Sequence, residues 1–293
     1  MWEKFIRVLL AQVIPVSTLT SPVAQTVPNV DIQVEPLAKI VQEQVEPPAI
    51  ASRAGLVIET HSNETLFEKN VWDVFPIASL TKLMTALVVR EHLELDTIVE
   101  VNPLAANIEG SRLGLIAYER MTVKDLLRGL LIPSGNDAAF ALSMAVAGNQ
   151  EQFVTLMNQR TKALGLENTR FVDPAGLGDG NVSSAFELAH LAKQVFKDPF
   201  LAEIMKEESA VLNAVDQEYV HQIKNTNRLL GTDLGKRIIA GKTGTTKSAG
   251  QCLIAYLRTD SDRTILSIVL GSPDRYSDMG TIIDWVDANY HWN

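Results

Sequence analysis

Apolar positions recur with two different periods along the chain, and the change of period separates its segments. The apolar runs 54–60 and 64–70 flank the polar turn His-Ser-Asn, which predicts a β-hairpin. Later in the chain, short apolar runs separated by turn residues predict three further strands. These strands are expected at residues 237–246, 250–259 and 263–272.

Helical spacing dominates between these two groups of strands and returns after the last of them. One helix is expected to end near Gly165, and another begins with a capping box made by Ser184 and Glu187. Strands near both ends with helices between them predict an α+β domain, whose antiparallel sheet of about five strands combines N- and C-terminal segments. The predicted helices cover residues 79–93, 123–131, 137–147, 149–166, 184–196 and 276–292.

Residues 1–25 have the pattern of a secretory signal. Lys4 and Arg7 precede an apolar run at residues 8–16, and no charged residue follows until Asp31. The run is shorter than the roughly 20 apolar residues that cross a bilayer. We therefore expect an exported protein whose first 25 residues are cleaved or kept as a membrane anchor. A disordered cytosolic tail is the alternative.

The rest of the chain divides into a linker and one domain. Residues 26–52 mix Pro, Glu and Val without a sustained period, which predicts an extended linker. Residues 53–293 are expected to form a single domain that buries a full core. The net charge of −9 and the pI near 5.1 argue against a nucleic-acid-binding surface. The one cysteine, Cys252, lies in an apolar run and is expected to be buried.

Several familiar catalytic patterns are missing from the sequence. It holds no Gly-x-Ser-x-Gly, and its five histidines show no metal-ligand spacing, so we predict neither a metal site nor a cofactor. His190 and His221 are interpreted as helix-surface or capping residues. Gly-Lys-Thr at 241–243 resembles the end of a phosphate-binding loop, but that pattern requires a glycine where Lys236 stands.

A serine and a lysine three positions apart, Ser79 and Lys82, stand at the start of one predicted helix. Residues at this spacing share a helix face, so the hydroxyl and the amine can meet. The positive end of the helix dipole would also favour negative charge on the Ser79 oxygen. Lys82 can act as a base only if burial or another cation destabilises its ammonium form. Taken alone, the pattern is more typical of a serine cap followed by a lysine that reaches solvent.

The second motif, Ser134-Gly135-Asn136, joins two predicted helices through a turn shaped by Pro133 and Gly135. One interpretation is that Ser134 or Asn136 caps the second helix. The other is that Ser134 relays protons while Asn136 hydrogen-bonds a substrate amide. The motif alone leaves both interpretations open.

The third motif, Lys242-Thr243-Gly244, lies in a predicted strand with a glycine on either side of Lys242 and Thr243. Such a strand edge lets another backbone approach closely, and a peptide can add to it as an extra strand. Lys242 would supply the second cation that lowers the pKa of Lys82, and Thr243 a hydroxyl for a substrate carboxylate. A plain glycine-rich hairpin is the alternative.

The three motifs together, in this order and each in a fitting local structure, are the signature of the penicillin-binding and serine β-lactamase group. Within it, the chain resembles the serine-type D-alanyl-D-alanine carboxypeptidases, which are penicillin-binding proteins of low molecular mass. The resemblance extends from about Ala54 to Trp292 and includes the segments at 163–178 and 183–195. It implies a β-lactamase/transpeptidase-like fold with a mainly helical subdomain inserted between the strands.

The resemblance also implies a division of catalytic roles. Ser79 would attack the carbonyl between two D-alanines of a peptidoglycan stem peptide and form an acyl-enzyme. Lys82 would take the Ser79 proton, and Ser134 with Lys242 would return it to the leaving amine. Asn136 would orient the substrate amide. β-Lactam antibiotics would act as covalent inhibitors.

The remaining implied roles concern substrate binding. The backbone N–H groups of Ser79 and Thr245 would form the oxyanion hole. Thr243 would hold the terminal carboxylate, with Gly244 beside it in the same strand. Arg275, near the end of the last strand, matches in position an arginine that binds this carboxylate.

Other members of the group remain alternatives. Class A β-lactamases carry Asp where this chain has Gly135, and they need a loop glutamate that the segment around Glu167 does not resemble, so inhibition by penicillin is expected rather than its hydrolysis. Because the chain ends at Asn293, we expect a single-domain form in which only the N-terminal segment can attach to a membrane. This form leaves open an endopeptidase that cuts peptidoglycan crosslinks. An esterase and an inactive binding module are further alternatives.

Overall fold

The computed structural model describes residues 39–40, 45–216 and 218–292. The expected signal or anchor at residues 1–25 lies outside the described residues, as does most of the expected linker. In the described part of the chain, no helix is both long and apolar enough to cross a membrane. The export and anchoring of the chain therefore stay predictions.

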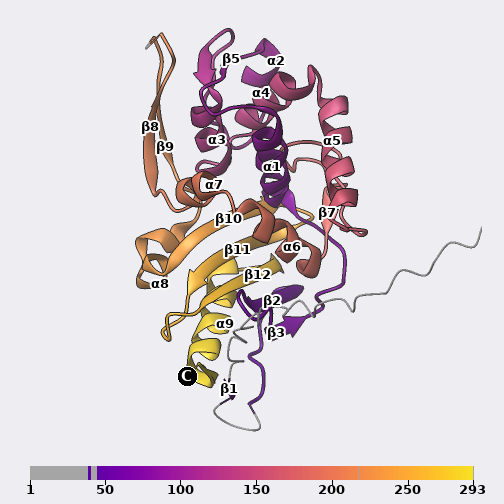
Figure 1. Cartoon of the computed structure of the whole chain (residues 1–293), viewed down its shortest axis with the longest axis vertical. Helices are drawn as coiled ribbons and strands as arrows, with labels where there is room; N and C mark the ends of the chain where they lie inside the picture. The colour runs from indigo at the N-terminus through magenta and orange to yellow at the C-terminus, as the bar shows by residue number, and fades with distance from the viewer. Residues whose placement is uncertain (1–38, 41–44, 217, 293) are drawn as a thin grey trace, which may run out of the picture. The chain divides into compact units, whose positions relative to one another are not determined.

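A five-stranded antiparallel sheet forms the centre of the fold, in the order β10-β11-β12-β2-β3 (Figure 1). The N-terminal hairpin, β2 and β3, completes a sheet whose other strands come from the C-terminal part, because β2 pairs with β12 from Glu59 opposite Ile265 to Ala54 opposite Leu270. This arrangement confirms the predicted architecture. The strands are β2 (Ala54–Glu59), β3 (Thr65–Lys69), β10 (Ile238–Thr246), β11 (Gly250–Arg258) and β12 (Thr264–Ser272).

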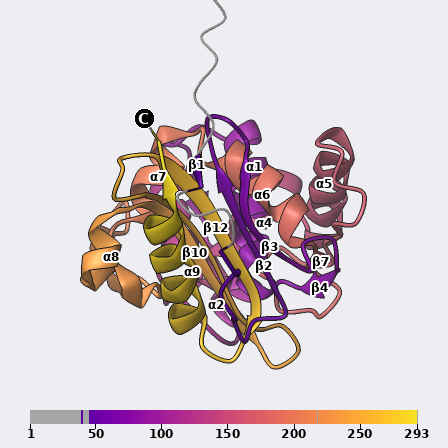
Figure 2. The same cartoon turned by 90° about the horizontal axis from the view of Figure 1, so that it is seen from below.

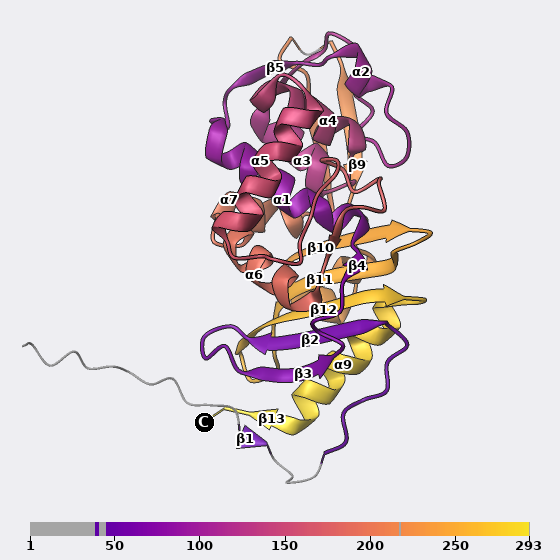
Figure 3. The ribbon, with the colours of Figure 1, turned by 90° about the vertical axis from the view of Figure 1, so that its right-hand side faces the viewer.

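Both faces of the sheet are covered. Alternate residues of a strand point to opposite faces, so in β2 Leu56 and Ile58 enter the core shared with the helical region, whereas Val57 enters the core under the C-terminal helix α9 (Arg275–Asn289). Figures 2 and 3 show α9 along one side of the sheet and most of the other helices beyond the opposite side. The uninterrupted apolar run in β2 follows from this double burial.

The helical region contains the helices expected from the apolar period. A 3₁₀ turn, η1 (Ala78–Thr81), precedes the first of them, so Ser79 lies in this turn rather than in the α-helix itself. The last helix ends at Asn289 instead of residue 292, because Tyr290 has an extended backbone and pairs in β13 (Tyr290–His291). The helices are α1 (Lys82–His92), α3 (Val123–Leu131), α4 (Asn136–Ala147), α5 (Gln150–Ala163), α6 (Ala185–Val195) and α7 (Pro199–Met205).

Short strand pairs, which the sequence does not predict, connect these parts. Three of the pairs are too brief for a clear alternating pattern. The fourth is a longer hairpin that ends beside the groove of the candidate active site. The pairs are β1 (Lys39–Ile40) with β13, β4 (Phe75–Pro76) with β7 (Val182–Ser183), β5 (Ile98–Glu100) with β6 (Arg120–Thr122), and β8 (Ser209–Asn213) with β9 (Val220–Lys224). The short helices α2 (Pro103–Ala106), η2 (Arg228–Gly231) and α8 (Asp233–Lys236) complete the described elements.

The two singled-out histidines have different environments. His190 lies on the exposed surface of α6, as expected. His221 is buried on β9 with its Nε2 atom 2.6 Å from Glu119 Oε1, so its interpretation as a helix-surface or capping residue is wrong. The alternation of β9 turns His221 inward, and a buried imidazole needs a polar partner.

The predicted capping box at α6 is only half formed. The Ser184 hydroxyl accepts a hydrogen bond from the Glu187 N–H at 3.2 Å, as expected of an N-cap. The Glu187 carboxylate, however, accepts hydrogen bonds from the Asn168 N–H and the Thr169 hydroxyl. It therefore ties the turn after α5 to α6 instead of closing the box.

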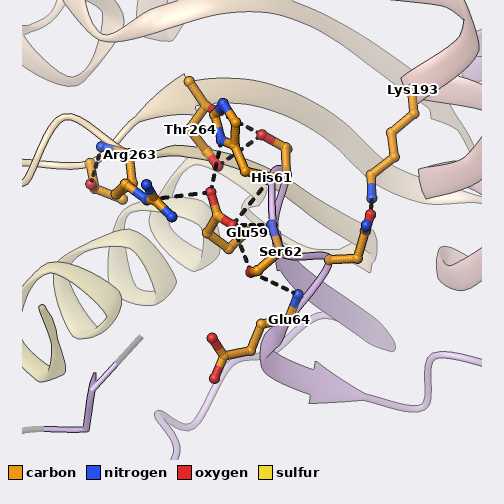
Figure 4. Close-up of polar contacts among 10 residues, drawn as sticks. Glu59, His61, Ser62, Glu64, Lys193, Arg263 and Thr264 are labelled. Carbon is orange, nitrogen blue, oxygen red and sulfur yellow. Dashed lines mark hydrogen bonds and ion pairs between the residues drawn. The ribbon is translucent and has the colours of Figure 1, made fainter. Parts of the chain in front are cut away.

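A buried carboxylate fixes the turn of the first hairpin (Figure 4). Glu59 accepts hydrogen bonds from the N–H of Ser62 at 2.6 Å, from the Ser62 hydroxyl at 2.7 Å and from the N–H of His61 at 3.1 Å. Burial raises the pKa of Glu59, but the hydrogen bonds from Ser62 and His61 outweigh it and hold the pKa below its usual value. Because the serine hydroxyl donates to the carboxylate rather than to the imidazole, this Ser-His-Glu cluster lacks the connectivity of a catalytic triad.

The last residues of the expected linker contact the domain. Ile50 is buried in the core under α9, and the Ala51 N–H donates to Asp278 Oδ1 at 2.9 Å. The Trp285 indole N–H donates to the Glu46 carbonyl at 3.0 Å. These residues take part in the domain without forming a helix or strand, and the boundary at residue 53 stays a prediction.

Candidate active site

The start of α1 brings Ser79 and Lys82 together. The Lys82 Nζ atom lies 3.0 Å from Ser79 Oγ, 2.8 Å from Asn136 Oδ1 and 2.6 Å from the Ala175 carbonyl oxygen. Lys82 is fully buried, so the lysine does not reach solvent as the alternative interpretation required. Ser79 is only partly buried and lines an open groove.

The surroundings of Lys82 favour its neutral amine. Burial lowers its pKa to about 7, although Asp173 and Asp137 act in the opposite direction. A neutral amine has two N–H donors and one lone pair, and these match the three partners. The two N–H groups can donate to Asn136 Oδ1 and the Ala175 carbonyl, which leaves the lone pair for the Ser79 hydroxyl proton. This is the arrangement of a nucleophile and its base.

The turn between α3 and α4 supplies the second motif. Gly135 is the N-cap of α4, so neither Ser134 nor Asn136 has the capping role of the alternative interpretation. The Asn136 side chain connects Lys82 to the preceding loop by donating from Nδ2 to the Glu109 carbonyl at 2.7 Å. Ser134 has a positive φ of 63°, which is costly for a residue with a side chain and typical of functional sites.

The third motif lies on β10, which pairs only with β11 among the described strands and so forms one edge of the sheet. The Lys242 Nζ atom donates to Ser134 Oγ at 2.8 Å and to the Thr243 carbonyl at 2.9 Å. Burial, followed by repulsion from Lys82 and Arg275, holds the pKa of Lys242 well below its usual value. For Lys82, too, burial is the main cause of the low pKa, rather than the charge of Lys242.

Glycine at position 244 allows β10 to lie against the nucleophile. A Cβ atom there would lie 2.9 Å from the Ile77 carbonyl oxygen and 3.0 Å from the Ser79 backbone nitrogen. The plain-hairpin alternative gives no reason for this contact between β10 and η1. Since Thr245 follows Gly244, the close approach brings the strand bearing the second expected oxyanion donor to the backbone of Ser79.

Arg275, the first residue of α9, reaches the same end of the groove. Its Nη1 atom donates to the Gly244 carbonyl at 2.8 Å and its Nη2 atom to Thr245 Oγ1 at 2.5 Å. The Thr243 hydroxyl lies 2.6 Å from the Thr226 hydroxyl at the end of β9. A guanidinium and hydroxyl groups therefore gather beside the open edge of β10, and such groups are suited to binding a carboxylate.

The groove has a volume of about 960 Å³. It joins the three motifs, since Ser79, Ser134 and the β10 edge all line it. Its remaining walls include the segment before α9 and the end of β9, and the sequence does not place the end of β9 near the motifs. The lining residues include Ser111, Lys224, Asn225, Thr226, Arg228 and Tyr276.

Two aspartates that the sequence interpretation does not single out hold the loops of the site. Asp137 is fully buried and accepts hydrogen bonds from the N–H groups of residues 113–115. Asp173 accepts hydrogen bonds from the N–H groups of residues 175–178 and from Asn181 Nδ2. The sequence signal for Asp173 is the Asp-Pro-Ala-Gly run, since Asp before such residues organises turns.

The Asp173 turn bears directly on the catalytic pair. It sets the Ala175 carbonyl on Lys82, and it places Gly176, with a φ of +84°, where a Cβ atom would lie 2.0 Å from the Ala78 carbonyl oxygen. We expect Asp173→Ala to slow acylation by fluorescent penicillin by about 10- to 100-fold, which corresponds to the 1–3 kcal/mol of donors left unpaired.

Thermal unfolding of this variant should also begin at a lower temperature. Asp179→Ala is the matched control, because Asp179 is an exposed aspartate of the same loop that bonds to Ser248 instead. Equal acylation rates in the two variants would contradict the positioning role of Asp173.

An α+β domain that arranges Ser-x-x-Lys, Ser-x-Asn and Lys-Thr-Gly around one groove is that of the penicillin-binding and serine β-lactamase group. The family model described as D-alanyl-D-alanine carboxypeptidase matches residues 41–274. The chain belongs to this family.

Known relatives agree with this assignment. The chain is 33% identical over 249 residues to the D-alanyl-D-alanine carboxypeptidase DacF of Bacillus subtilis, covering 82% of this chain and 63% of DacF. It is 32% identical over 248 residues to a D-alanyl-D-alanine endopeptidase of Pseudomonas aeruginosa, covering 82% and 78%. The crystal structure of the Streptomyces K15 DD-transpeptidase matches with a TM-score of 0.77 and 30% identity, covering 83% of this chain and all of that one. The chain thus spans less than two thirds of DacF but the full length of the K15 structure.

Proposed function

We propose that the chain is a serine D,D-carboxypeptidase that removes the terminal D-alanine from peptidoglycan stem peptides. The observation that carries this proposal is the Ser79–Lys82 pair, 3.0 Å apart, in which a buried lysine has a pKa of about 7. Membership of the family supports the reaction class. The groove beside the open edge of β10 can receive an extended peptide.

The first half of the reaction forms an acyl-enzyme. Neutral Lys82 takes the hydroxyl proton of Ser79 while Ser79 Oγ attacks the carbonyl carbon between the two D-alanines. The negative charge on the carbonyl oxygen is stabilised by the backbone N–H groups of Ser79 and Thr245. Ser134, hydrogen-bonded to Lys242, gives its proton to the leaving amine and receives the proton that Lys82 took, so that free D-alanine departs and Lys82 is neutral again.

The second half returns the serine. Water attacks the acyl carbon while neutral Lys82 takes one of its protons, and Lys82 returns this proton to Ser79 Oγ as the Ser79–acyl bond breaks and the shortened peptide leaves. Arg275, Thr243 and Thr245 hold the terminal carboxylate in the first half, and Asn136 orients the substrate amide with its second Nδ2 hydrogen. Asn136 also positions Lys82 through the bond to its Oδ1 atom.

A muropeptide digest tests the function. Purified chain is incubated with pentapeptide monomers and with crosslinked dimers, and the products are weighed by mass spectrometry. Loss of one D-alanine from the pentapeptide is expected. Cleavage of the dimer alone would instead make the chain an endopeptidase, which the similarity to the Pseudomonas enzyme keeps as the second candidate. No change in either substrate would overturn both.

Penicillin is expected to acylate Ser79 and to stay attached. Fast hydrolysis of the adduct would need a carboxylate that activates water. Asp274, the carboxylate that lines the groove, is already engaged as the N-cap of α9, where it accepts hydrogen bonds from the N–H groups of Tyr276 and Ser277. Glu167 is exposed beside the turn after α5 and lines other hollows of the surface. Since a general base contributes on the order of 10²–10⁴ in rate, hydrolysis of the penicillin ester should lag that of a class A β-lactamase by about this factor.

The persistence of the penicillin adduct can be followed by intact-protein mass spectrometry over hours. Nitrocefin turnover gives the complementary readout, with the Ser79→Ala variant as the blank. Rapid turnover of nitrocefin without D-alanine release would contradict the proposal and make the chain a β-lactamase or esterase.

We further propose that the enzyme acts outside the cytoplasmic membrane, where peptidoglycan lies. The basic and apolar pattern of residues 1–25 supports export, with cleavage or retention of the segment as a membrane anchor. Fractionation of cells that produce the full chain, followed by N-terminal sequencing, distinguishes a cleaved signal from a retained anchor.

A further inference from the structure

A stack of aromatic rings on the surface has no part in the proposed reaction. Trp72 and Phe186 lie with ring centroids 4.0 Å apart and planes tilted by 33°, and Phe186 lies 4.6 Å from the His190 ring. Trp72 keeps 61% of its surface exposed, so the stack does not serve to bury it. Tryptophan is enriched at binding surfaces because its ring combines a large apolar face with an N–H group.

The stack is held in place by both chain segments that supply it. The Phe186 N–H donates to the Val71 carbonyl at 3.0 Å, which ties the loop after β3 to the first turn of α6. The His190 ring nitrogen Nδ1 bonds to the Phe186 carbonyl at 3.0 Å, so Nε2 is the nitrogen that can meet a ligand. The Trp72 ring is thus presented without the cost of ordering it on binding.

A groove continues from this stack along the end of α5. A hollow of about 290 Å³ contains the three rings, and a neighbouring hollow of about 560 Å³ shares Gly165, Leu166 and Glu167 with it. Lys162 and Arg170 line the far hollow, and in the described part of the chain neither has a carboxylate partner. The groove therefore combines an aromatic platform at one end with two cations at the other, and the exposed Glu167 lines both parts.

We propose that this groove binds the glycan strand of peptidoglycan, with a sugar ring on Trp72 and the carboxylates of a stem peptide on Lys162 and Arg170. The face of an indole is negative, so it attracts the weakly positive C–H hydrogens on the flat side of a sugar. The polar side chains that line the groove suit hydroxyl and amide groups better than lipid chains. The choice of polymer rests on the proposed function, whereas the platform and the cations are independent of it.

The position of the groove suits a second contact with the substrate polymer. Trp72 precedes Ser79 by only seven residues, a length of chain that spans at most about 25 Å. β4 lies between them and pairs with β7, the strand that leads into α6 (Figure 2). A strand bound at Trp72 would thus raise the local concentration of its stem peptides at Ser79.

A sedimentation assay with insoluble peptidoglycan tests the inference. The full chain carries Ser79→Ala, so that no substrate is turned over. Adding Trp72→Ala should weaken binding by about tenfold, while Trp72→Phe should retain most of it. Leu104→Ala is the matched control, because Leu104 is an equally exposed apolar residue, at 70%, outside the groove.

A second comparison separates the two ends of the groove. The double variant Lys162→Gln, Arg170→Gln should bind intact peptidoglycan about threefold to tenfold less tightly, yet bind glycan strands stripped of stem peptides as well as the parent chain does. With Ser79 restored, Trp72→Ala should release D-alanine from a short soluble pentapeptide at the unchanged rate.

The outcomes are decisive in both directions. Unchanged sedimentation of the Trp72→Ala variant would overturn the inference. The inference would also be overturned if Trp72→Ala weakened binding to lipid vesicles, or self-association of the chain, and left glycan binding intact. If the parent chain released no D-alanine from the soluble pentapeptide, the proposed function would be overturned instead. The two failures are therefore distinguishable.

Discussion

A Ser79→Ala variant is expected to form no covalent adduct with fluorescent penicillin, whereas the parent chain is labelled within minutes. The reason is geometric, because the Ser79 hydroxyl both contacts Lys82 Nζ at 3.0 Å and lines the groove. Alanine keeps the turn and removes the only atom that can form the ester at this position. The loss should be complete, and gel fluorescence with intact-protein mass spectrometry measures it.

Ser134 is the matched control, since its hydroxyl also touches a buried lysine and also lines the groove. Ser134→Ala should still be labelled, but more slowly, because we propose that Ser134 passes a proton and does not form the ester. The loss of a proton relay of this kind costs on the order of 10²–10⁴ in rate. Labelling of Ser79→Ala with no labelling of Ser134→Ala would reverse the two assignments.

Unfolding measurements complete this experiment. Ser79 is partly exposed and gives Lys82 only one of its three partners. Its replacement should therefore shift the midpoint of thermal unfolding little. A variant that is both unlabelled and unfolded at the assay temperature would show a folding defect, and Ser79→Cys, which keeps a nucleophilic atom, should then recover slow labelling.

The central sheet could be predicted largely because two of its strands, β2 and β12, are mainly apolar along their length. β2 and β12 are buried on both faces, so their composition alone separates them from the helices. The β8–β9 hairpin gives no such signal. β9 alternates exposed and buried residues and includes His221, whose burial depends on Glu119, about a hundred positions earlier in the chain. A partner at that separation cannot be inferred from local pattern.

The site was predictable to a similar degree. The three motifs could be identified from the sequence. The structure brings Lys82 into hydrogen-bond contact with Ser79 and Asn136, and Lys242 with Ser134, beside the groove that Ser79 and Ser134 both line. What could not be predicted is what holds these residues in place. Asp137 and Asp173 act through backbone N–H groups of irregular loops, and such loops leave little periodic signal in a sequence.

The electrostatics of Lys82 also required the structure. The sequence suggests that a second lysine lowers the pKa of Lys82. The larger cause is the complete burial of Lys82, whose amine contacts the Asp173 turn and Asn136. Burial depends on the packing of segments far apart in the chain. The resulting pKa of about 7 leads to the second prediction with a large expected effect.

The rate of penicillin acylation should rise with pH through about 7 and then level off, because only neutral Lys82 can accept the Ser79 proton. Below this pH the rate should fall about tenfold for each pH unit, because one proton must leave Lys82 before it can act as the base. Lys82→Met should lose about 10³- to 10⁴-fold in rate and should lose this pH step as well. Stopped-flow acylation between pH 5 and 9 gives both results.

The same pKa predicts how stability changes with pH. The pKa of Lys82 is 10.5 when unfolded and about 7 when folded, so between these values the unfolded chain binds more protons. The free energy of unfolding of the parent chain, measured against that of Lys82→Met, should therefore rise with pH across this window by up to roughly 1.4 kcal/mol per unit. Urea titrations at pH 7, 8 and 9 measure this difference. A difference that stays flat, together with an acylation rate that is constant from pH 5 to 9, would mean that Lys82 remains charged and that another group takes the Ser79 proton.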